Sequence, residues 1–269
     1  MVDWRQLRRS QGSRRGLGEL ERLDSPGDSP GVLALHGFGG SPEEMRLVVE
    51  AASAAGLRAL APSLARHHSS EALAQSRAED WLNGARQELS GFGDGQPVIL
   101  VGMSLGAVLA TQLANELPER VVGLVLLAGA FWLKSPQIAL PLSLVARLPA
   151  SRWAMPKPAS DIREPAAREN HVSFDLQPLS AAASVWSAGR GSRALLPSIR
   201  VPTLLAHGRW DRLCPVSNLE RTAALLGTRD VVKLRLERSG HIVTRDHDAP
   251  ELGAAMTRFF ERLRAQCAP

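Results

Sequence analysis

The chain alternates short apolar runs with amphipathic segments along most of its length. Six apolar runs predict strands, at 32–35, 57–60, 98–101, 122–127, 203–206 and 232–236. Several of them are apolar at every position rather than at every second one, which is typical of parallel strands covered on both faces of a sheet. Because these strands alternate with helical patterns, the sequence predicts an α/β fold.

Three residue pairs have the spacing of a helix capping box, with a short polar residue followed three positions later by glutamate. They are Ser41 with Glu44, Ser217 with Glu220, and Asp248 with Glu251. In the first pair, Pro42 also occupies the first helical position, which favours proline. We therefore expect helices to begin directly after residues 41, 217 and 248.

The alternation of strands and helices stops between Phe131 and Ile199, where prolines recur and no clean strand is predicted. A stretch of this length is unusual as one structureless loop, so we interpret 131–198 as an inserted cap of short helices. The α/β core then comprises 26–130 and 199–269. Residues 1–25 are interpreted as a basic, flexible N-terminal arm.

Charge and composition exclude several classes of protein. The net charge is +5, but residues 1–15 hold five arginines and one aspartate, so the remainder is nearly neutral and no nucleic-acid partner is expected. The longest apolar run is about 13 residues, short of the roughly 20 that a membrane span needs. With no signal-peptide pattern near Met1, we expect a soluble cytoplasmic protein. Two distant cysteines, Cys214 and Cys267, predict neither a disulfide framework nor a zinc site.

The sharpest chemical signal is the pentapeptide from Gly102 to Gly106, which reads Gly-Met-Ser-Leu-Gly. It directly follows the apolar strand at 98–101 and directly precedes a helical run from Ala107. Small residues are needed on both sides because a serine in a tight strand-to-helix turn leaves no room for side chains there. The pattern predicts Ser104 as a nucleophile exposed at a helix N-terminus.

A serine nucleophile needs a histidine base and a carboxylate that orients it. His241 follows the last predicted strand on a loop at its carboxyl end, where α/β sheets bind ligands, so it is the predicted base. Asp211 follows the strand at 203–206 and is the predicted acid. Asp230 and Asp246 are the weaker alternatives for the acid.

The tetrahedral intermediate also needs two backbone N–H donors. One is expected from Leu105, the residue after the nucleophile. The other is expected from Phe38, because the segment His36–Gly40 reads His-Gly-Phe-Gly-Gly after the first core strand and its glycines let the main chain curl toward the serine.

Taken together, these segments resemble the bacterial carboxylesterase and monoacylglycerol lipase group of α/β-hydrolases, from about Gly31 to Phe260. The resemblance rests on HGFGGSPEEM from His36, GMSLG from Gly102, Asp211, and SGHIVTRD from Ser239. It implies a mostly parallel eight-stranded sheet flanked by helices, a small cap and no cofactor. Where that group usually has a Pro-Gly-His-Gly turn after the second core strand, this chain has Ala-Pro-Ser-Leu-Ala-Arg-His-His.

The resemblance implies hydrolysis of short- to medium-chain carboxylic esters, including monoacylglycerols. We expect a serine carboxylesterase, with some of the cap aromatics Phe131, Trp132, Trp153, Phe174 and Trp186 lining an acyl pocket. Another acyl hydrolase with the same triad, such as a thioesterase or a lactonase, is the first alternative because a fold does not fix its substrate. A catalytically silent binding protein of the same fold is the second.

Overall fold

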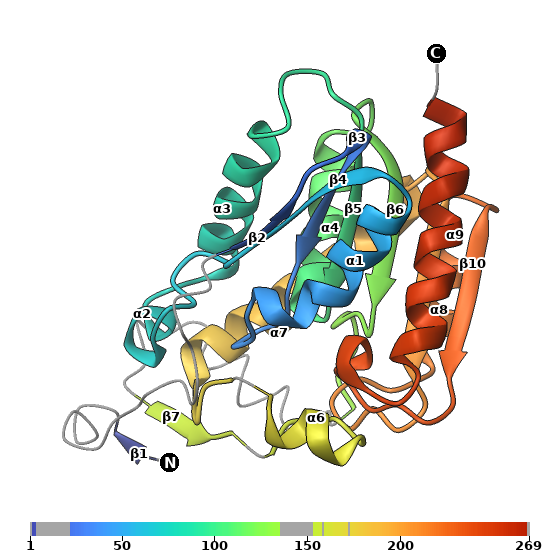
Figure 1. Ribbon diagram of the computed structural model, residues 1–269. Helices are drawn as coiled ribbons and strands as arrows, with labels where there is room; N and C mark the ends of the chain where they lie inside the picture. The colour runs from blue at the N-terminus through green and yellow to red at the C-terminus, as the bar shows by residue number, and fades with distance from the viewer. Residues whose placement is uncertain (1, 4–21, 135–152, 158, 172, 268–269) are drawn as a thin grey trace.

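A computed structural model describes residues 2–3, 22–134, 153–157, 159–171 and 173–267 of the chain (Figure 1). Its centre is a sheet with the strand order β10-β9-β6-β5-β3-β4-β2. The six predicted strands are confirmed as β3 (Asp28–Leu35), β4 (Leu57–Pro62), β5 (Val98–Met103), β6 (Val121–Leu127), β9 (Thr203–Gly208) and β10 (Val231–Leu236). These six are parallel to one another, as the continuous apolar runs predicted.

Both faces of the central strands are buried. In β5, Val98 and Leu100 pack into one hydrophobic cluster, whereas Ile99 and Val101 pack into a second cluster on the opposite face. This division follows from the pleat of a strand, which sends successive side chains to opposite faces. At one edge of the sheet, β10 carries Lys233 and Arg235, and such charges discourage pairing with another chain.

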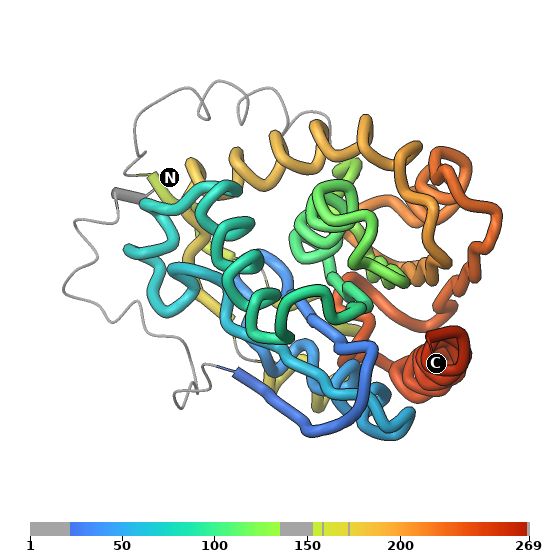
Figure 2. The backbone as a smooth tube through the Cα atoms, turned by 90° about the horizontal axis from the view of Figure 1, so that it is seen from above, coloured from blue at the N-terminus to red at the C-terminus, as the bar shows by residue number. Residues whose placement is uncertain are grey.

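Helices cover each face of the sheet (Figure 2). The first hydrophobic cluster, which contains Val98 and Leu100, is covered by α3 (Ala78–Ser90), α4 (Leu105–Glu116), α7 (Leu179–Ser192) and α8 (Asn218–Leu225). The second hydrophobic cluster, which contains Ile99 and Val101, is covered by α1 (Arg46–Ala54) and α9 (Ala249–Cys267). Leu252, Met256, Phe259 and Leu263 form the buried stripe of α9, at the three- and four-residue spacing of an amphipathic helix. The chain therefore has the α/β-hydrolase fold, in which the carboxyl ends of the parallel strands lie at one edge.

The expected count of eight strands is corrected to seven in the described part of the main sheet. The seventh strand, β2 (Arg22–Ser25), pairs antiparallel with β4, from Arg22 opposite Pro62 to Ser25 opposite Ala59. These four residues were assigned to the N-terminal arm, but their backbone groups complete the open edge of β4. Val2 and Asp3 form β1 (Val2–Asp3), which pairs with β7 in a separate small sheet. Most of the predicted arm, residues 4–21, lies outside the described residues.

The region predicted as a helical cap contains strands as well as helices. The small sheet has the order β1-β7-β8, with β7 (Trp153–Pro156) antiparallel to β8 (Leu176–Pro178). The helices are α6 (Pro165–Glu169), α7 and the 3-10 helix η3 (Arg193–Ser198). Residues 135–152 of the predicted cap lie outside the described part of the chain.

The remaining described elements are η2 (Pro42–Met45), α2 (Ser70–Ala74) and η4 (Val243–Arg245). The helix starts predicted after residues 41, 217 and 248 are confirmed. However, Ser41 and Ser217 make no side-chain cap hydrogen bond, and the side chains of Glu44 and Glu220 bind partners elsewhere. No described helix is both long enough and apolar enough to cross a membrane.

Candidate active site

Ser104 lies in a tight turn between β5 and α4. Its φ of 55° is in the left-handed region, which costs a non-glycine residue free energy. A Cβ on Gly102 would lie 2.1 Å from the Gly106 carbonyl oxygen, and one on Gly106 would lie 1.9 Å from that of Leu35. Both flanking positions therefore require glycine, as the sequence predicted. The turn is fixed further because the Ser104 N–H donates to the Leu127 carbonyl at 2.8 Å.

His241 is held on the loop after β10 by the inserted region and by Asp211. Its backbone N–H donates to the Asp161 carbonyl at 2.9 Å, and its Nδ1 lies 2.7 Å from Oδ2 of Asp211. Since a carboxylate only accepts, Nδ1 carries the proton. Gly240 lets these segments approach, because a Cβ there would lie 2.7 Å from the Asp161 carbonyl oxygen. The tautomer leaves Nε2 as the basic nitrogen of the neutral ring.

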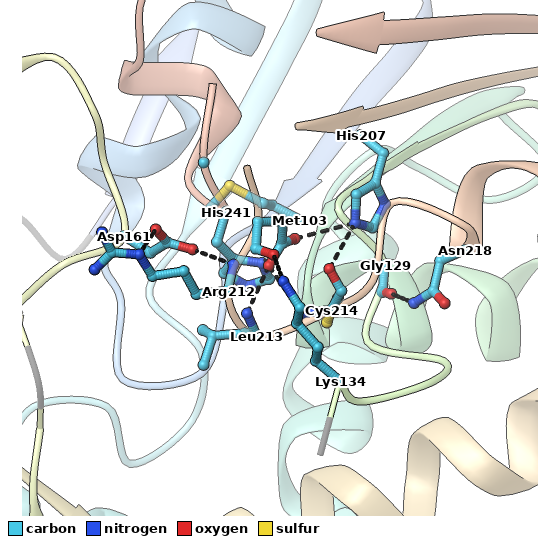
Figure 3. Close-up of polar contacts among 12 residues, drawn as sticks. Met103, Gly129, Lys134, Asp161, His207, Arg212, Leu213, Cys214, Asn218 and His241 are labelled. Carbon is cyan, nitrogen blue, oxygen red and sulfur yellow. Dashed lines mark hydrogen bonds and ion pairs between the residues drawn. The ribbon is translucent and has the colours of Figure 1, made fainter. Parts of the chain in front are cut away.

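Both carboxylate oxygens of Asp211 accept hydrogen bonds from neighbouring residues. Oδ1 accepts the backbone N–H groups of Leu213 and Cys214, both at 2.8 Å. Oδ2 accepts from Nδ1 of His241 and also lies 3.0 Å from Nε2 of His207. The Asp211 side chain is completely buried, whereas that of His241 is 7% exposed. Figure 3 shows His241 between Asp161 and His207, with the His207 ring also directed at the Cys214 carbonyl.

Two opposing effects set the charge of this pair. Burial acts to raise the pKa of the Asp211 carboxyl, but the attraction and hydrogen bonds of His241 and His207 outweigh it and hold the pKa far below its ordinary value. Burial acts to lower the pKa of His241, but the charge and hydrogen bond of Asp211 raise it above 6.5. Asp211 is therefore an ionised carboxylate that stabilises the protonated, imidazolium form of His241.

The contact between His207 and Asp211 is not among the features that the sequence predicts. The available signal was the place of His207 directly after an apolar run, in the same His-Gly dipeptide as His36. Histidines at the carboxyl ends of parallel strands share one edge of the sheet with the loops that bind ligands. His207 thus makes a second hydrogen bond to the same carboxylate oxygen.

The glycine-rich segment after β3 lies against Ser104. A Cβ on Gly37 would lie 3.5 Å from the Ser104 Cβ. The Gly37 carbonyl accepts from Nδ1 of His36 at 2.8 Å and from the Gly40 N–H at 3.1 Å. Nε2 of His36 accepts the Leu64 N–H at 3.0 Å, which leaves the proton of the neutral ring on Nδ1. Because C=O and N–H of a trans peptide point in opposite directions, these bonds turn the Phe38 N–H away from the His36 ring.

The other candidate acids have different partners. Asp230 is on the surface and pairs with Arg262 at 2.9 Å. The buried Asp246 accepts four backbone N–H groups, from Arg163, Glu164, Gly240 and His247, at 2.7–2.9 Å. Asp246 therefore joins the inserted region to the His241 loop, and neither aspartate is hydrogen-bonded to the His241 ring in the described structure.

The described cap aromatics divide between core and surface. Phe131 and Phe174 are buried in the first hydrophobic cluster, whereas Trp153 is 40% exposed. Trp132 is partly buried, and the guanidinium groups of Arg193 and Arg221 lie over its ring, at 4.9 and 5.5 Å from the ring centre. His67 belongs to the segment that replaces the Pro-Gly-His-Gly turn after β4, and its ring packs edge-on against Phe38 and Trp81. This contact supports the glycine-rich segment from its outer side.

Among the described residues, one group could supply metal ligands. Atoms of Asp211, Cys214 and His241 lie within 4.8 Å of one another. Metal binding requires a thiolate, but burial and the charge of Asp211 raise the pKa of the Cys214 thiol well above its ordinary value. The donor set therefore fits a carboxylate that orients an imidazole better than it fits a metal ion.

Comparisons with known proteins identify the family of the chain and several similar proteins. The family described as "Alpha/beta hydrolase family" matches residues 32–255. A "Thermostable monoacylglycerol lipase" of Bacillus sp. (strain H-257) is 26% identical over 237 residues, which cover 86% of this chain and 90% of the relative.

Two solved structures extend the likeness. A chain described under "LipS and LipT, two metagenome-derived lipolytic enzymes" is 28% identical with a TM-score of 0.82, covering 90% of this chain and 97% of that one. The monoacylglycerol lipase of Paleococcus ferrophilus is 17% identical with a TM-score of 0.77, covering 90% and 98%. These three similar proteins are lipolytic enzymes, and the chain itself belongs to the alpha/beta hydrolase family.

Proposed function

We propose that the protein is a serine carboxylesterase that hydrolyses short- to medium-chain carboxylic esters, including monoacylglycerols. The observation that carries the proposal is the 2.7 Å contact between Asp211 and His241, taken together with the strained turn at Ser104. In this arrangement Ser104 is the nucleophile, His241 is the base and Asp211 orients it. The likeness to the Bacillus lipase supports ester chemistry.

The reaction proceeds in two half-reactions. Nε2 of His241 takes the hydroxyl proton of Ser104 as Oγ bonds to the ester carbonyl carbon, and the proton then passes to the departing alcohol. A water molecule next gives its proton to Nε2 and its oxygen to the acyl carbon, which releases the acid and restores the Ser104 hydroxyl. Asp211 accepts the Nδ1–H throughout and stabilises the imidazolium.

The backbone N–H groups of Phe38 and Leu105 are proposed as the oxyanion donors. Leu105 is the first residue of α4, and the first N–H groups of a helix have no acceptor within it. The peptide of Phe38 is oriented by the bonds that hold the Gly37 carbonyl. Donors fixed in advance stabilise the developing charge without reorganisation.

The region 131–198 is proposed to act as a cap that selects acyl length, with partly buried aromatics such as Trp132 lining the acyl pocket. Each additional buried methylene contributes about 0.8 kcal/mol, which corresponds to about 4-fold in kcat/KM. Selectivity should rise from acetyl esters to butyryl and octanoyl esters, and then fall when the chain exceeds the pocket.

The test combines a substrate panel with one variant. A series of p-nitrophenyl esters from acetyl to palmitoyl, run beside acyl thioesters and lactones, separates the esterase from the thioesterase and lactonase alternatives. Ser104→Ala should reduce turnover on the order of 10⁶-fold. A fluorophosphonate should label Ser104 in the wild type, and absence of labelling would indicate the silent binding protein. A Ser104→Ala variant with half of the wild-type activity would require another nucleophile.

A further inference from the structure

Glu44 is a buried carboxylate that the hydrolytic steps do not use. It lies in η2, next to the glycine-rich segment, and its side chain is 4% exposed. Burial acts to raise the pKa of its carboxyl, but the hydrogen bond from His171 and nearby positive charge, including that of Lys157, outweigh burial and lower the pKa to about 2. Glu44 is therefore an anion inside the protein, and a buried charge requires partners that fix its position.

One carboxylate oxygen of Glu44 holds the segment that carries the Phe38 N–H. Oε2 accepts the Gly37 backbone N–H at 3.2 Å. Gly40 also lies against the carboxylate, because a Cβ added there would lie 2.2 Å from Oε2. The main chain from Gly37 to Gly40 thus wraps around the carboxylate. Glu44 holds the peptide before Gly37, while the Nδ1 of His36 holds the peptide after it.

The other oxygen binds the inserted region. Oε1 lies 3.0 Å from Nε2 of His171, whose side chain is 1% exposed. Nδ1 of His171 lies 2.6 Å from the Ser160 hydroxyl, so two parts of the insertion meet at this ring. A second contact lies beside it, because a Cβ on Gly39 would lie 3.5 Å from the Phe174 ring. The insertion therefore touches the glycine-rich segment through both a polar and an apolar contact.

We propose that Glu44 is a positioning residue. It couples the packing of the insertion, residues 131–198, against the glycine-rich segment to the geometry of the oxyanion hole. The inference rests on the proposed function, since it assigns the Phe38 N–H to the oxyanion. With His171 in place, the carboxylate is fixed between two partners and the Gly37 peptide is held in position. Without His171, the carboxylate loses the partner on its other oxygen and no longer constrains Gly37.

The experiment compares Glu44→Ala, Glu44→Gln and His171→Ala with Glu43→Ala as the matched control. Glu43 is the adjacent residue of η2, but its carboxylate pairs with Arg46 at the surface. For each variant, kcat and KM are measured with p-nitrophenyl butyrate. The dissociation constant of a boronic acid, which forms a tetrahedral adduct with the serine, reports the oxyanion hole directly.

Glu44→Ala should lower kcat by about 10- to 100-fold with little change in KM, because removing one oxyanion donor costs about 10²- to 10³-fold and here a donor is displaced rather than lost. Affinity for the boronic acid should fall by the same factor. Glu44→Gln should recover most of kcat, since its carbonyl accepts the Gly37 N–H while its amide donates to the other tautomer of His171. Glu43→Ala should behave as wild type.

The coupling has its own test. His171→Ala should lower kcat in the same direction, and the double variant of Glu44 and His171 should be no slower than Glu44→Ala alone, because both changes remove one interaction. If Glu44→Ala fails to fold, His171→Ala and the rescue by Glu44→Gln decide the question. An unchanged kcat and boronic acid affinity in these variants, with Ser104→Ala inactive, would overturn the positioning role and leave the esterase proposal intact.

Discussion

The role of Asp211 can be tested with an isosteric change, Asp211→Asn. The side-chain carbonyl of asparagine can still accept the N–H groups of Leu213 and Cys214, so the loop keeps two of its hydrogen bonds. Its amide group then faces Nδ1 of His241 as a donor. The ring must therefore accept at Nδ1 and carry its proton on Nε2, where it cannot take the serine proton.

The expected loss follows from this wrong tautomer. A triad with asparagine in place of aspartate loses about 10⁴-fold in kcat. That loss corresponds to about 5.4 kcal/mol of transition-state stabilisation. The variant should remain folded, since no buried N–H of the loop loses its acceptor. The assay is kcat for p-nitrophenyl butyrate, beside a thermal unfolding curve.

The pH profile gives an independent readout. The base is active when neutral, so kcat/KM of the wild type should rise with pH through the raised pKa of His241, above 6.5. In Asp211→Asn the burial of His241 remains but the charge that opposes it is gone. The acidic limb should therefore move to lower pH. Asp230→Asn is the control, because Asp230 pairs with Arg262 away from the site. Near wild-type activity in Asp211→Asn, or an unmoved limb, would refute the assignment.

Three further outcomes are expected. Gly106→Ala should abolish activity and lower the melting temperature, because its Cβ would lie 1.9 Å from the Leu35 carbonyl oxygen; a stable, active variant would contradict the turn geometry. Asp246→Ala should lower the melting temperature by several degrees and raise KM, since four backbone N–H groups lose their acceptor; calorimetry and kinetics check both. Trp132→Ala should raise KM more for octanoyl than for acetyl esters, and a flat profile would remove Trp132 from the acyl pocket.

Much of the core was predictable because its signals are local. Continuous apolar runs mark strands such as β5, and the Gly-Met-Ser-Leu-Gly pentapeptide marks the turn at Ser104. The strand β2 escaped prediction because its four residues, Arg-Leu-Asp-Ser, carry no apolar run and form a strand only beside β4. In the insertion, β8 is three residues long and ends in Pro178, so nothing in its sequence indicates a strand.

The role of Glu44 was misread for a related reason. Its spacing from Ser41 is that of a capping box, but the side chain binds His171, 127 positions away in the sequence. A local pattern cannot show that a distant imidazole will bind the same carboxylate. His207 differs, because its partner Asp211 is only four positions away and the path of the loop after β9 determines their contact.

The pairing of β6 with β9 has a consequence for when this protein reaches its active fold during synthesis. Leu124 lies opposite Thr203 and Leu127 opposite Ala206, although 79 positions separate each pair along the chain. Ser104 and the glycine-rich segment precede this junction, whereas Asp211 and His241 follow it. A ribosome therefore completes the first half long before the second, and the nascent half contains the proposed nucleophile without its proposed base. Contacts between residues that are this far apart in the sequence form late in refolding. The appearance of the proposed esterase activity would mark the moment when the two halves of the sheet join.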